Sequence, residues 1–340
     1  MLFRSTDPAS WPREHFRGLR AVVNASAMTA VDTAETTEGR AQAWAVNATA
    51  VAELARRCTE AGVPLAHVST DYVFDGALPV GQEHPVDHPL APLGVYGQSK
   101  AAGEAAVRTV PRHWIVRTSW VIGEGKNFVA TMASLAERGI DPAVVADQHG
   151  RLTFADDLAD ALLHLVTTDA PTGTFHMTNS GDVVTWHDVA RWVFEDTGHD
   201  AARVSATTTA AYLAGKEGVA PRPTNSALDL GPLAAVGYTA PGQRERLREH
   251  LAAEHPAVHL AGGRAREADL TRHRVRRGRR QLQDPAQQVG GVRRGRGRAD
   301  RCATGAGTGM ALRHGRLLRR GWTPRRRGGP GRDGPGTMLA

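Results

Sequence analysis

Tyr96 and Lys100 stand four residues apart in the segment VYGQSK (95–100), a spacing that places two side chains on one face of a helix. A lysine ammonium beside a phenol stabilises the phenolate and lowers the pKa of the tyrosine. A tyrosine tuned in this way can exchange a proton with a substrate near neutral pH. Thr70, in the segment STDYVFDG (69–76), offers a hydroxyl to the same substrate oxygen. Together these side chains could protonate a carbonyl group while it is reduced.

The Tyr-x-x-x-Lys spacing also arises by chance on solvated helices, and taken alone that is the better interpretation. The surrounding pattern favours chemistry. Residues 63–70 read as a strand that ends in Ser69 and Thr70, and residues 95–110 read as a helix. Ligands of parallel α/β sheets bind beyond the carboxyl ends of the strands. The pattern therefore predicts a site where this strand ends.

Short apolar runs alternate with segments of helical periodicity along the chain. The apolar runs predict strands at 63–70, 114–123 and 173–179, a strand that ends in a tight loop at 19–27, and a strand followed by a loop at 143–150. The segments of helical periodicity predict helices at 39–62, 95–110, 127–139 and 155–169, and a capped helix at 185–198. This alternation predicts an α/β fold with a Rossmann-like parallel sheet that helices cover on both faces. We expect residues 1–150 to form a partial dinucleotide-binding domain and residues 151–255 to form mainly a smaller, interleaved substrate-binding domain.

Charge divides the chain into two unlike parts. Residues 263–340 contain 21 of the 42 basic residues and five of the 35 acidic ones, a net charge of +16, which leaves −9 for residues 1–262. The basic part shows no periodicity and predicts a disordered tail rich in Arg and Gly. Its composition suggests translation out of frame. An RNA-binding tail is the rival, which the lack of interleaved aromatic residues disfavours, so nucleic acid is not expected as a partner.

Other features exclude several classes of protein. The two cysteines, Cys58 and Cys302, have no ligand spacing and predict neither a metal site nor a disulfide framework. No apolar run reaches the roughly 18 residues of a membrane-spanning helix, and the first residues lack the apolar region of a signal peptide. We expect a cytoplasmic protein. The sequence leaves the oligomeric state open, a homodimer being one option.

Eight segments occur in an order that resembles the dTDP-4-dehydrorhamnose reductase family, a group of extended short-chain dehydrogenases/reductases: VVNASAMTAVDTAE, VNATAVAELARRC, HVSTDYVFDG, VYGQSKAAGE, VRTSWVIG, NFVATM, DQHGRLTFADDLA and RPTNSALD. The resemblance spans roughly residues 6–252. Tyr-x-x-x-Lys alone marks only the superfamily, whereas STDYVFDG joined to RTSWV and RPTNSALD is specific to this group.

The resemblance implies that NADPH or NADH gives a hydride to C4 of dTDP-4-dehydro-L-rhamnose, which yields dTDP-L-rhamnose. It implies that Tyr96 donates the proton, that Lys100 binds the nicotinamide ribose and tunes Tyr96, and that Thr70 holds the sugar carbonyl. Asp71 and Trp120 match family positions that contact the sugar, although a turn-capping aspartate and a core tryptophan are the plain alternatives.

The resemblance also implies cofactor contacts at a strand end with small side chains, which allow close backbone approach: Asn24, Ala25, Ser26 and Ala27. Tight packing of a strand end is the alternative. Asn47 is expected to order the loops beside the cofactor, or else to lie on a helix face. Arg222 is expected to meet a substrate phosphate through its planar fork, or else to be a surface arginine. Asp32 and Glu35 are expected on a solvated face or in a first helical turn.

The sequence departs from the family pattern at its start. The family begins with a strand, a Gly-x-x-Gly-x-x-Gly turn and a helix, and such a turn binds the cofactor pyrophosphate. No such turn precedes Asn24, so we expect an N-terminally truncated sheet without the first two βα units. Met28 stands at the usual tyrosine position, and Leu152 and Phe154 also differ from the family pattern.

Two other classes fit parts of the pattern. The regulatory subunit of methionine adenosyltransferase shares this fold and is non-catalytic. Nucleotide-sugar epimerases and dehydratases share the superfamily. The presence of Thr70, Tyr96 and Lys100 disfavours the non-catalytic class. The motif STDYVFDG and Trp120 favour a reductase over an epimerase or dehydratase.

Overall fold

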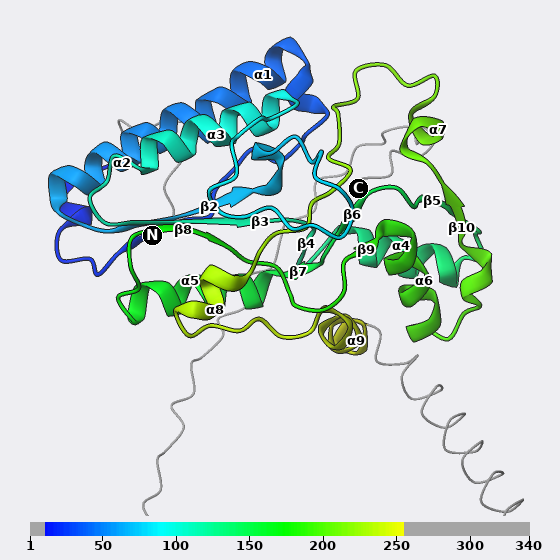
Figure 1. Ribbon diagram of the computed structural model, residues 1–340. Helices are drawn as coiled ribbons and strands as arrows, with labels where there is room; N and C mark the ends of the chain where they lie inside the picture. Colours follow the sequence, from blue (N-terminus) through cyan, green and yellow to red (C-terminus); the bar gives the residue numbers. More distant parts are fainter. Residues whose placement is uncertain (1–10, 255–340) are drawn as a thin grey trace, which may run out of the picture. The chain divides into compact units, whose positions relative to one another are not determined.

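Four parallel strands form the central sheet of the computed structural model, which describes residues 11–254 (Figure 1). The strands lie in the order β1 (Val22–Asn24), β2 (Leu65–Thr70), β3 (His113–Thr118) and β8 (Gly173–His176). The predicted parallel sheet is confirmed. Strand β1 ends in a loop, as expected, and the side chain of Asn24 accepts a hydrogen bond from the backbone N–H of Ser26 where the chain leaves the ladder.

Helices cover both faces of this sheet, as predicted (Figure 1). One face carries α1 (Thr37–Trp44), α2 (Ala50–Ala61) and α3 (Val95–Val107), and the other carries α5 (Ala155–Thr167) and α8 (Gly231–Ala235). The predicted helix 39–62 consists of α1 and α2 joined by a π-helical turn at Ala45–Thr49. Gly62 ends it in the left-handed conformation, with φ of 66°, which only glycine adopts without strain.

The side chains of β3 alternate between the two faces, as the geometry of a strand requires. Trp114 and Val116 pack with the buried leucines of α5, whereas Ile115 packs with α2 and α3. Each fully buried side chain of this size contributes about 1.5–3 kcal/mol. The sheet is therefore the shared centre of two apolar layers.

A second group of elements lies beside the sheet and contains three short strand pairs. These are β4 (Val121–Ile122) with β7 (Thr153–Phe154), β5 (Ala143–Val145) with β10 (Ser205–Thr207), and β6 (His149–Gly150) with β9 (Val184–Thr185). The helices of the group are α4 (Phe128–Glu137), α6 (Trp186–Asp196), α7 (Thr209–Leu213) and α9 (Gln243–Glu254).

The predicted single strand 114–123 is wrong, because it is two strands, and Trp120 between them has φ of 48° and breaks the extended backbone. The strand predicted at the start of 143–150 is β5, and the short strand β6 follows its loop. Residues on both sides of position 150 contribute to both groups of elements, since β8 joins the central sheet while α4 packs against α6. The domain boundary at 150 stays a prediction.

Polar side chains fix the ends of several helices. Asn127 caps α4, and Thr185 with Asp188 caps α6 as a reciprocal capping box. Glu35 accepts a hydrogen bond from the N–H of Val95 at the start of α3 (2.8 Å), and Asp32 pairs with Arg222. Glu35 lies in the first turn of the short helix Thr33–Glu35, which is one of its two expected places, and Asp32 directly precedes that helix. Both acids also hold distant segments in place.

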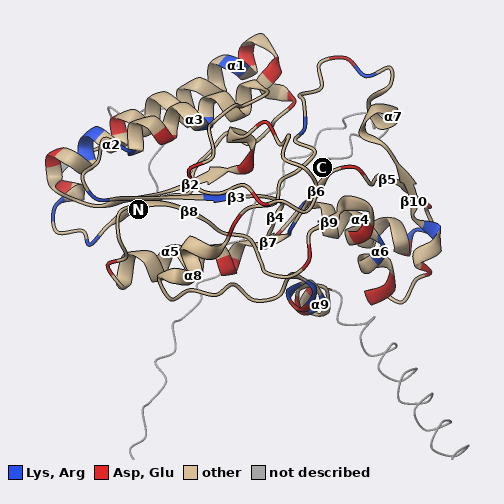
Figure 2. Cartoon of the chain, in the orientation of Figure 1, with Lys and Arg blue, Asp and Glu red and all other residues tan. Residues whose placement is uncertain are grey.

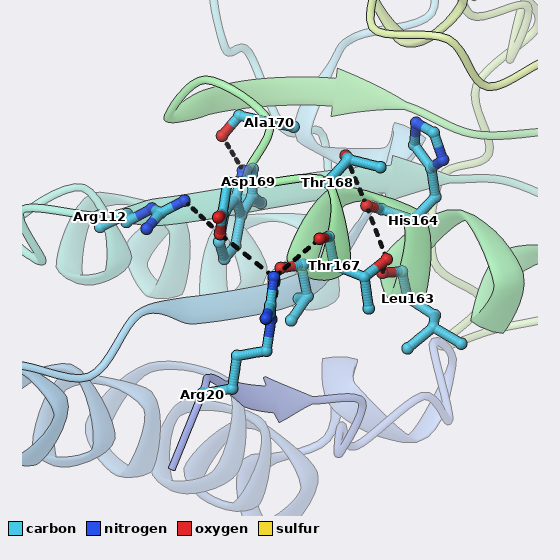
Figure 3. Close-up of polar contacts among 10 residues, drawn as sticks. Arg20, Arg112, Leu163, His164, Thr167, Thr168, Asp169 and Ala170 are labelled. Atoms are coloured by element: carbon cyan, nitrogen blue, oxygen red, sulfur yellow. Dashed lines mark hydrogen bonds and ion pairs between the residues drawn. The ribbon is translucent and has the colours of Figure 1, made fainter. Parts of the chain in front are cut away.

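Arg20 anchors the chain before β1 to the end of α5 (Figure 3). Its guanidinium donates to the carbonyl oxygens of Val166 (3.2 Å) and Thr167 (2.7 Å), where the helix dipole favours a cation. Asp169, just beyond the helix, accepts from Arg112 (2.8 Å) and lies 3.5 Å from Arg20. These contacts tie three segments together at the amino end of β3.

Acidic and basic residues are interspersed over the described helices (Figure 2). The net charge of residues 1–262 is −9. No helix within residues 11–254 is long and apolar enough to cross a membrane. Cys58 is a buried free thiol in α2. The predicted tail, 263–340, lies outside the described residues, and so does Cys302.

A buried ion pair joins α3 to β3. The guanidinium of Arg117 donates two hydrogen bonds to Glu104, each 2.8 Å long, and both side chains are at most 1% exposed. Burial raises the pKa of the Glu104 carboxyl, but Arg117 outweighs burial and the pKa lies below its ordinary value. The pair is thus charged, and each partner depends on the other.

We expect Glu104→Gln to lower the free energy of unfolding by about 3–5 kcal/mol, because it leaves Arg117 buried without a counter-ion. Urea titration of both proteins measures this difference. The difference in the free energy of unfolding should be largest above the pKa of an unfolded glutamate, about 4.3. It should shrink as pH falls toward the lower pKa of Glu104 in the folded state. Glu53→Gln, which breaks ion pairs on the surface of α2, is the control and should cost less than about 1 kcal/mol. Equal losses in the two variants would contradict this role of the buried pair.

Candidate active site

A cavity of ≈ 600 Å³ lies at the carboxyl ends of β2 and β3, beside the start of α3. This is the edge of a parallel sheet at which ligands bind. Seven of the residues predicted to form the site line it: Ala25, Ala27, Thr70, Asp71, Tyr96, Lys100 and Trp120. The tertiary structure therefore brings together most of the predicted catalytic, cofactor and substrate positions.

Thr70, Asp71 and Tyr96 form a connected polar group in the cavity wall. The hydroxyl of Thr70 donates to the Asp71 carboxylate (2.9 Å), and Thr70 is also a hydrogen-bond partner of the Tyr96 hydroxyl. Burial raises the pKa of Tyr96 to about 12, against the opposing effect of Thr70. Burial likewise raises the pKa of Asp71 to about 6, although Ser226 and Thr70 lower it.

The prediction that Lys100 lowers the pKa of Tyr96 stays a prediction, because burial is the largest influence on the Tyr96 pKa here. The Lys100 amine donates to the carbonyl oxygen of Val68 (2.6 Å) and lies 3.2 Å from the ring of His67, so its bonds run toward the sheet. Burial lowers the pKa of Lys100 to about 8, and Glu104 opposes that shift. Desolvation thus dominates both groups and keeps Tyr96 a neutral phenol, which is the form that donates a proton.

Two glycines allow α3 to approach the sheet this closely. A Cβ atom at Gly97 would lie 2.1 Å from the carbonyl oxygen of Tyr72, and one at Gly103 would lie 2.3 Å from that of Asn47. Any side chain at these positions would push α3 away from its neighbours. The burial of Tyr96 and Lys100 therefore depends on both glycines.

Aromatic rings form the outer wall of the cavity. Trp120 stacks on Trp186, with ring centroids 3.9 Å apart, and Phe128 packs against Trp186 at 4.5 Å. The φ of 48° at Trp120 is rare for a bulky residue and marks a constrained position. A Cβ atom at Gly150 would lie 2.8 Å from the Trp120 ring, so this glycine makes room for it. Trp120 is therefore a cavity residue and not simply a core residue.

Trp186 and Phe128 also line the cavity, and neither was predicted from the sequence. They are the first residues of α6 and α4, and the helical pattern of these segments gave no reason to expect a ring in a binding site. Only the meeting of α4, α6 and the β3–β4 connection places these rings together.

Two buried asparagines hold the loop that follows β1. Asn24 accepts from the N–H (3.1 Å) and hydroxyl (2.7 Å) of Ser26. Asn47 accepts from the N–H of Met28 (2.9 Å) and donates to its carbonyl oxygen (3.1 Å) and to Ser99 (3.0 Å). Asn47 thus orders this loop, as expected, and is not an exposed helix-face residue. Asn24, Ser26 and Asn47 stand behind the cavity wall, which Ala25 and Ala27 form.

Arg222 lies outside the cavity wall and is engaged by an acid. It donates two hydrogen bonds to Asp32 (2.9 and 3.0 Å) and one to the carbonyl oxygen of Ala220 (3.0 Å). Its side chain is 9% exposed, so the alternative of a surface arginine is wrong. The pair holds the segment that contains the cavity residue Pro223.

The cavity suits the nicotinamide half of a dinucleotide. Ala25 and Ala27 give a wall without bulky side chains, and Tyr96 and Lys100 lie at the same cavity. Within residues 11–254, no Gly-x-x-Gly-x-x-Gly turn follows a strand, so the described residues supply no glycine cradle for the pyrophosphate. The same residues contain no group of three or more His, Cys, Asp or Glu side chains arranged to hold a metal ion.

Sequence and structure comparisons agree on one family. Residues 13–255 match the family model described as RmlD substrate binding domain. A dTDP-4-dehydrorhamnose reductase of Mycobacterium tuberculosis is 43% identical over 239 residues, which cover 69% of this chain and 76% of the relative. The reductase of Streptomyces griseus is also 43% identical, over 223 residues that cover 64% of this chain and 70% of the relative.

Solved structures show the same similarity. A dTDP-4-dehydrorhamnose reductase of Bacillus anthracis in complex with NADP matches with a TM-score of 0.66 and 31% identity, covering 74% of this chain and 87% of that one. A dTDP-4-dehydrorhamnose reductase of Clostridium acetobutylicum matches with a TM-score of 0.64 and 33% identity, covering 71% and 84%. With the cavity and its motifs in the same fold, this chain belongs to the dTDP-4-dehydrorhamnose reductase family, whose members reduce dTDP-linked sugars.

Proposed function

We propose that this protein reduces the C4 keto group of dTDP-4-dehydro-L-rhamnose to give dTDP-L-rhamnose, with NADPH or NADH as the reductant. The observation that carries the proposal is the buried, neutral Tyr96, which lines the same cavity as Thr70 at the carboxyl end of the sheet. Reduction of a ketone needs a proton donor at the carbonyl oxygen, and a neutral phenol beside a second hydroxyl provides one.

The side chains have separate roles in this reaction. Ala25 and Ala27 would hold the nicotinamide ring, which would supply the hydride for C4. Thr70 holds the carbonyl oxygen, and Tyr96 gives that oxygen its phenolic proton. Charge then develops on the Tyr96 oxygen. A protonated Lys100 on the same helix face stabilises this phenolate and hands on a proton.

The outer part of the cavity suits a sugar nucleotide. The stacked rings of Trp120 and Trp186 offer an apolar wall to the C–H face of a sugar, and the Asp71 carboxylate can accept hydrogen bonds from sugar hydroxyls. Arg222 would reach a substrate phosphate only by giving up part of its pair with Asp32. We therefore assign Arg222 to hold the cavity wall at Pro223, while Asn24, Ser26 and Asn47 shape the loop beside the cofactor.

The proposal is tested by incubating the full chain with the keto-sugar and NADPH or NADH. Loss of the reduced-nicotinamide absorbance together with formation of dTDP-L-rhamnose by NMR would support it. An isomerised or dehydrated sugar with no net use of cofactor would indicate an epimerase or a dehydratase. Cofactor binding without any change in the sugar would favour the non-catalytic class.

We expect Tyr96→Phe to lower kcat by about 10²–10⁴-fold, because the phenolic proton is lost while the ring and its packing remain. Steady-state kinetics measure this, and titration of NADPH fluorescence should show that cofactor binding is kept. The matched control is Tyr212→Phe, which removes the hydroxyl of a tyrosine on α7 outside the cavity wall. Similar kcat values for the two variants would rule out Tyr96 as the proton donor.

The raised pKa of Asp71 predicts an acid limb in the pH profile. Burial raises this pKa to about 6, so the carboxylate form, which accepts from sugar hydroxyls, is lost as pH falls below about 6. We expect kcat/KM to fall in the same range, since this ratio reports the free enzyme. Asp71→Asn should lower kcat/KM by about 10–100-fold at neutral pH and abolish the limb. Asp75→Asn, in the same motif, should keep it. An unchanged limb in Asp71→Asn would contradict the assignment.

A further inference from the structure

A line of three buried side chains joins the loop after β1 to Lys100. The amide nitrogen of Asn24 lies 3.0 Å from Nδ1 of His67, and Nε2 of the same ring lies 3.2 Å from Nζ of Lys100. The three residues are 7%, 0% and 2% exposed. Asn24 and His67 are also direct partners in the register of β1 and β2. The line therefore crosses from the edge of the sheet to the helix that carries Tyr96.

The hydrogen-bond partners fix which nitrogen of His67 carries the proton. Oδ1 of Asn24 accepts from the backbone N–H of Ser26, a group that can only donate, so the amide oxygen is identified and Nδ2 faces His67. An amide NH₂ group also only donates. Nδ1 of His67 must therefore accept. Burial holds the pKa of His67 well below its ordinary value, so the ring is neutral and its single proton sits on Nε2.

The Nε2–H of His67 then points at Lys100. A lysine ammonium has three donors and no acceptor, whereas a neutral amine has a lone pair. The neutral amine can accept from His67 and still donate to the carbonyl oxygen of Val68, 2.6 Å away. The ammonium would keep the bond to Val68 but face an opposing N–H. The geometry therefore distinguishes between the two protonation states.

We propose that His67 is a positioning residue for Lys100: Asn24 locks the ring in the Nε2–H tautomer, and that N–H favours the neutral amine of Lys100. The consequence for catalysis rests on the proposed reduction, in which Lys100 must take up and release a proton next to Tyr96. Because Oδ1 of Asn24 also holds Ser26, the loop beside Ala25 and Ala27 is coupled to the lysine.

Other groups around Lys100 also influence its protonation. Glu104, one turn along α3, favours the ammonium, and it is itself paired with Arg117 from β3. Tyr96 on the same helix is neutral, and Asp71 lies at the end of β2. Asn24, from β1, is uncharged. Desolvation and the His67 N–H thus both act against the ammonium, and Glu104 acts for it.

The sequence makes the test unusually direct, because the whole chain has three lysines: Lys100, Lys126 and Lys216. Protein labelled with ¹³C-lysine gives three side-chain Cε signals, which Lys126→Arg and Lys216→Arg assign without loss of Lys100. We expect Lys100 to titrate well below the ordinary lysine value of about 10.4. Nitrogen NMR of labelled histidine, with His67→Gln used for assignment, should show His67 protonated at Nε2 and not at Nδ1.

Two variants then test whether the tautomer of His67 influences the pKa of Lys100. In Asn24→Asp the carboxylate should accept from Nδ1–H, move the proton off Nε2 and leave that atom free to accept from the ammonium. His67→Gln can offer its amide oxygen to Lys100. We expect the Lys100 pKa to rise by about one unit or more in each variant, about a tenfold shift in its protonation equilibrium.

Protonation at Nδ1 in the unaltered chain would overturn the proposal, and so would a Lys100 pKa that is unchanged in both folded variants. The tautomer is read in the unaltered chain, so the test holds even if a variant fails to fold. Neither the tautomer of His67 nor the pKa of Lys100 requires a substrate to be measured. A failure of this proposal can therefore be told apart from a failure of the proposed reduction.

Discussion

The close contact between α3 and the end of β2 determines most of what the cavity can do. Gly97 and Gly103 remove the side chains that would hold the helix away. Tyr96 and Lys100 are desolvated as a result, and desolvation opposes the charged form of each. The same packing therefore keeps the tyrosine neutral and brings the lysine within reach of neutral pH.

Such burial is stable only because the polar groups around it are paired. Unpaired buried groups cost free energy, and a buried charge costs more. Arg117 and Glu104 neutralise each other between β3 and α3. Asn47 ties the loop at Met28 to Ser99 on α3. These bonds hold the catalytic helix, the sheet and the loop after β1 as one assembly, so the position of Tyr96 depends on residues that never touch a substrate.

The outer wall of the cavity depends on a different kind of contact. Trp120 and Trp186 come from segments far apart in sequence and meet face to face. The backbone at Trp120 is held in the left-handed region, and Gly150 leaves room for its ring. Strain of this kind persists only where the surroundings fix it. The wall that would face a sugar is thus preformed by packing between the two groups of elements.

The sequence by itself determined the parallel sheet, its covering helices and the pairing of Tyr96 with Lys100 on one helix face, because these depend on local periodicity. It also determined the family, because each motif of the resemblance is a continuous stretch of the chain. Only the tertiary structure decided that burial raises the pKa of Tyr96 and that Arg222 is held by Asp32. It alone brought Trp186 to Trp120 and His67 to Lys100. Electrostatic environment and long-range contact depend on which distant residues exclude water around a side chain, and periodicity carries no record of that.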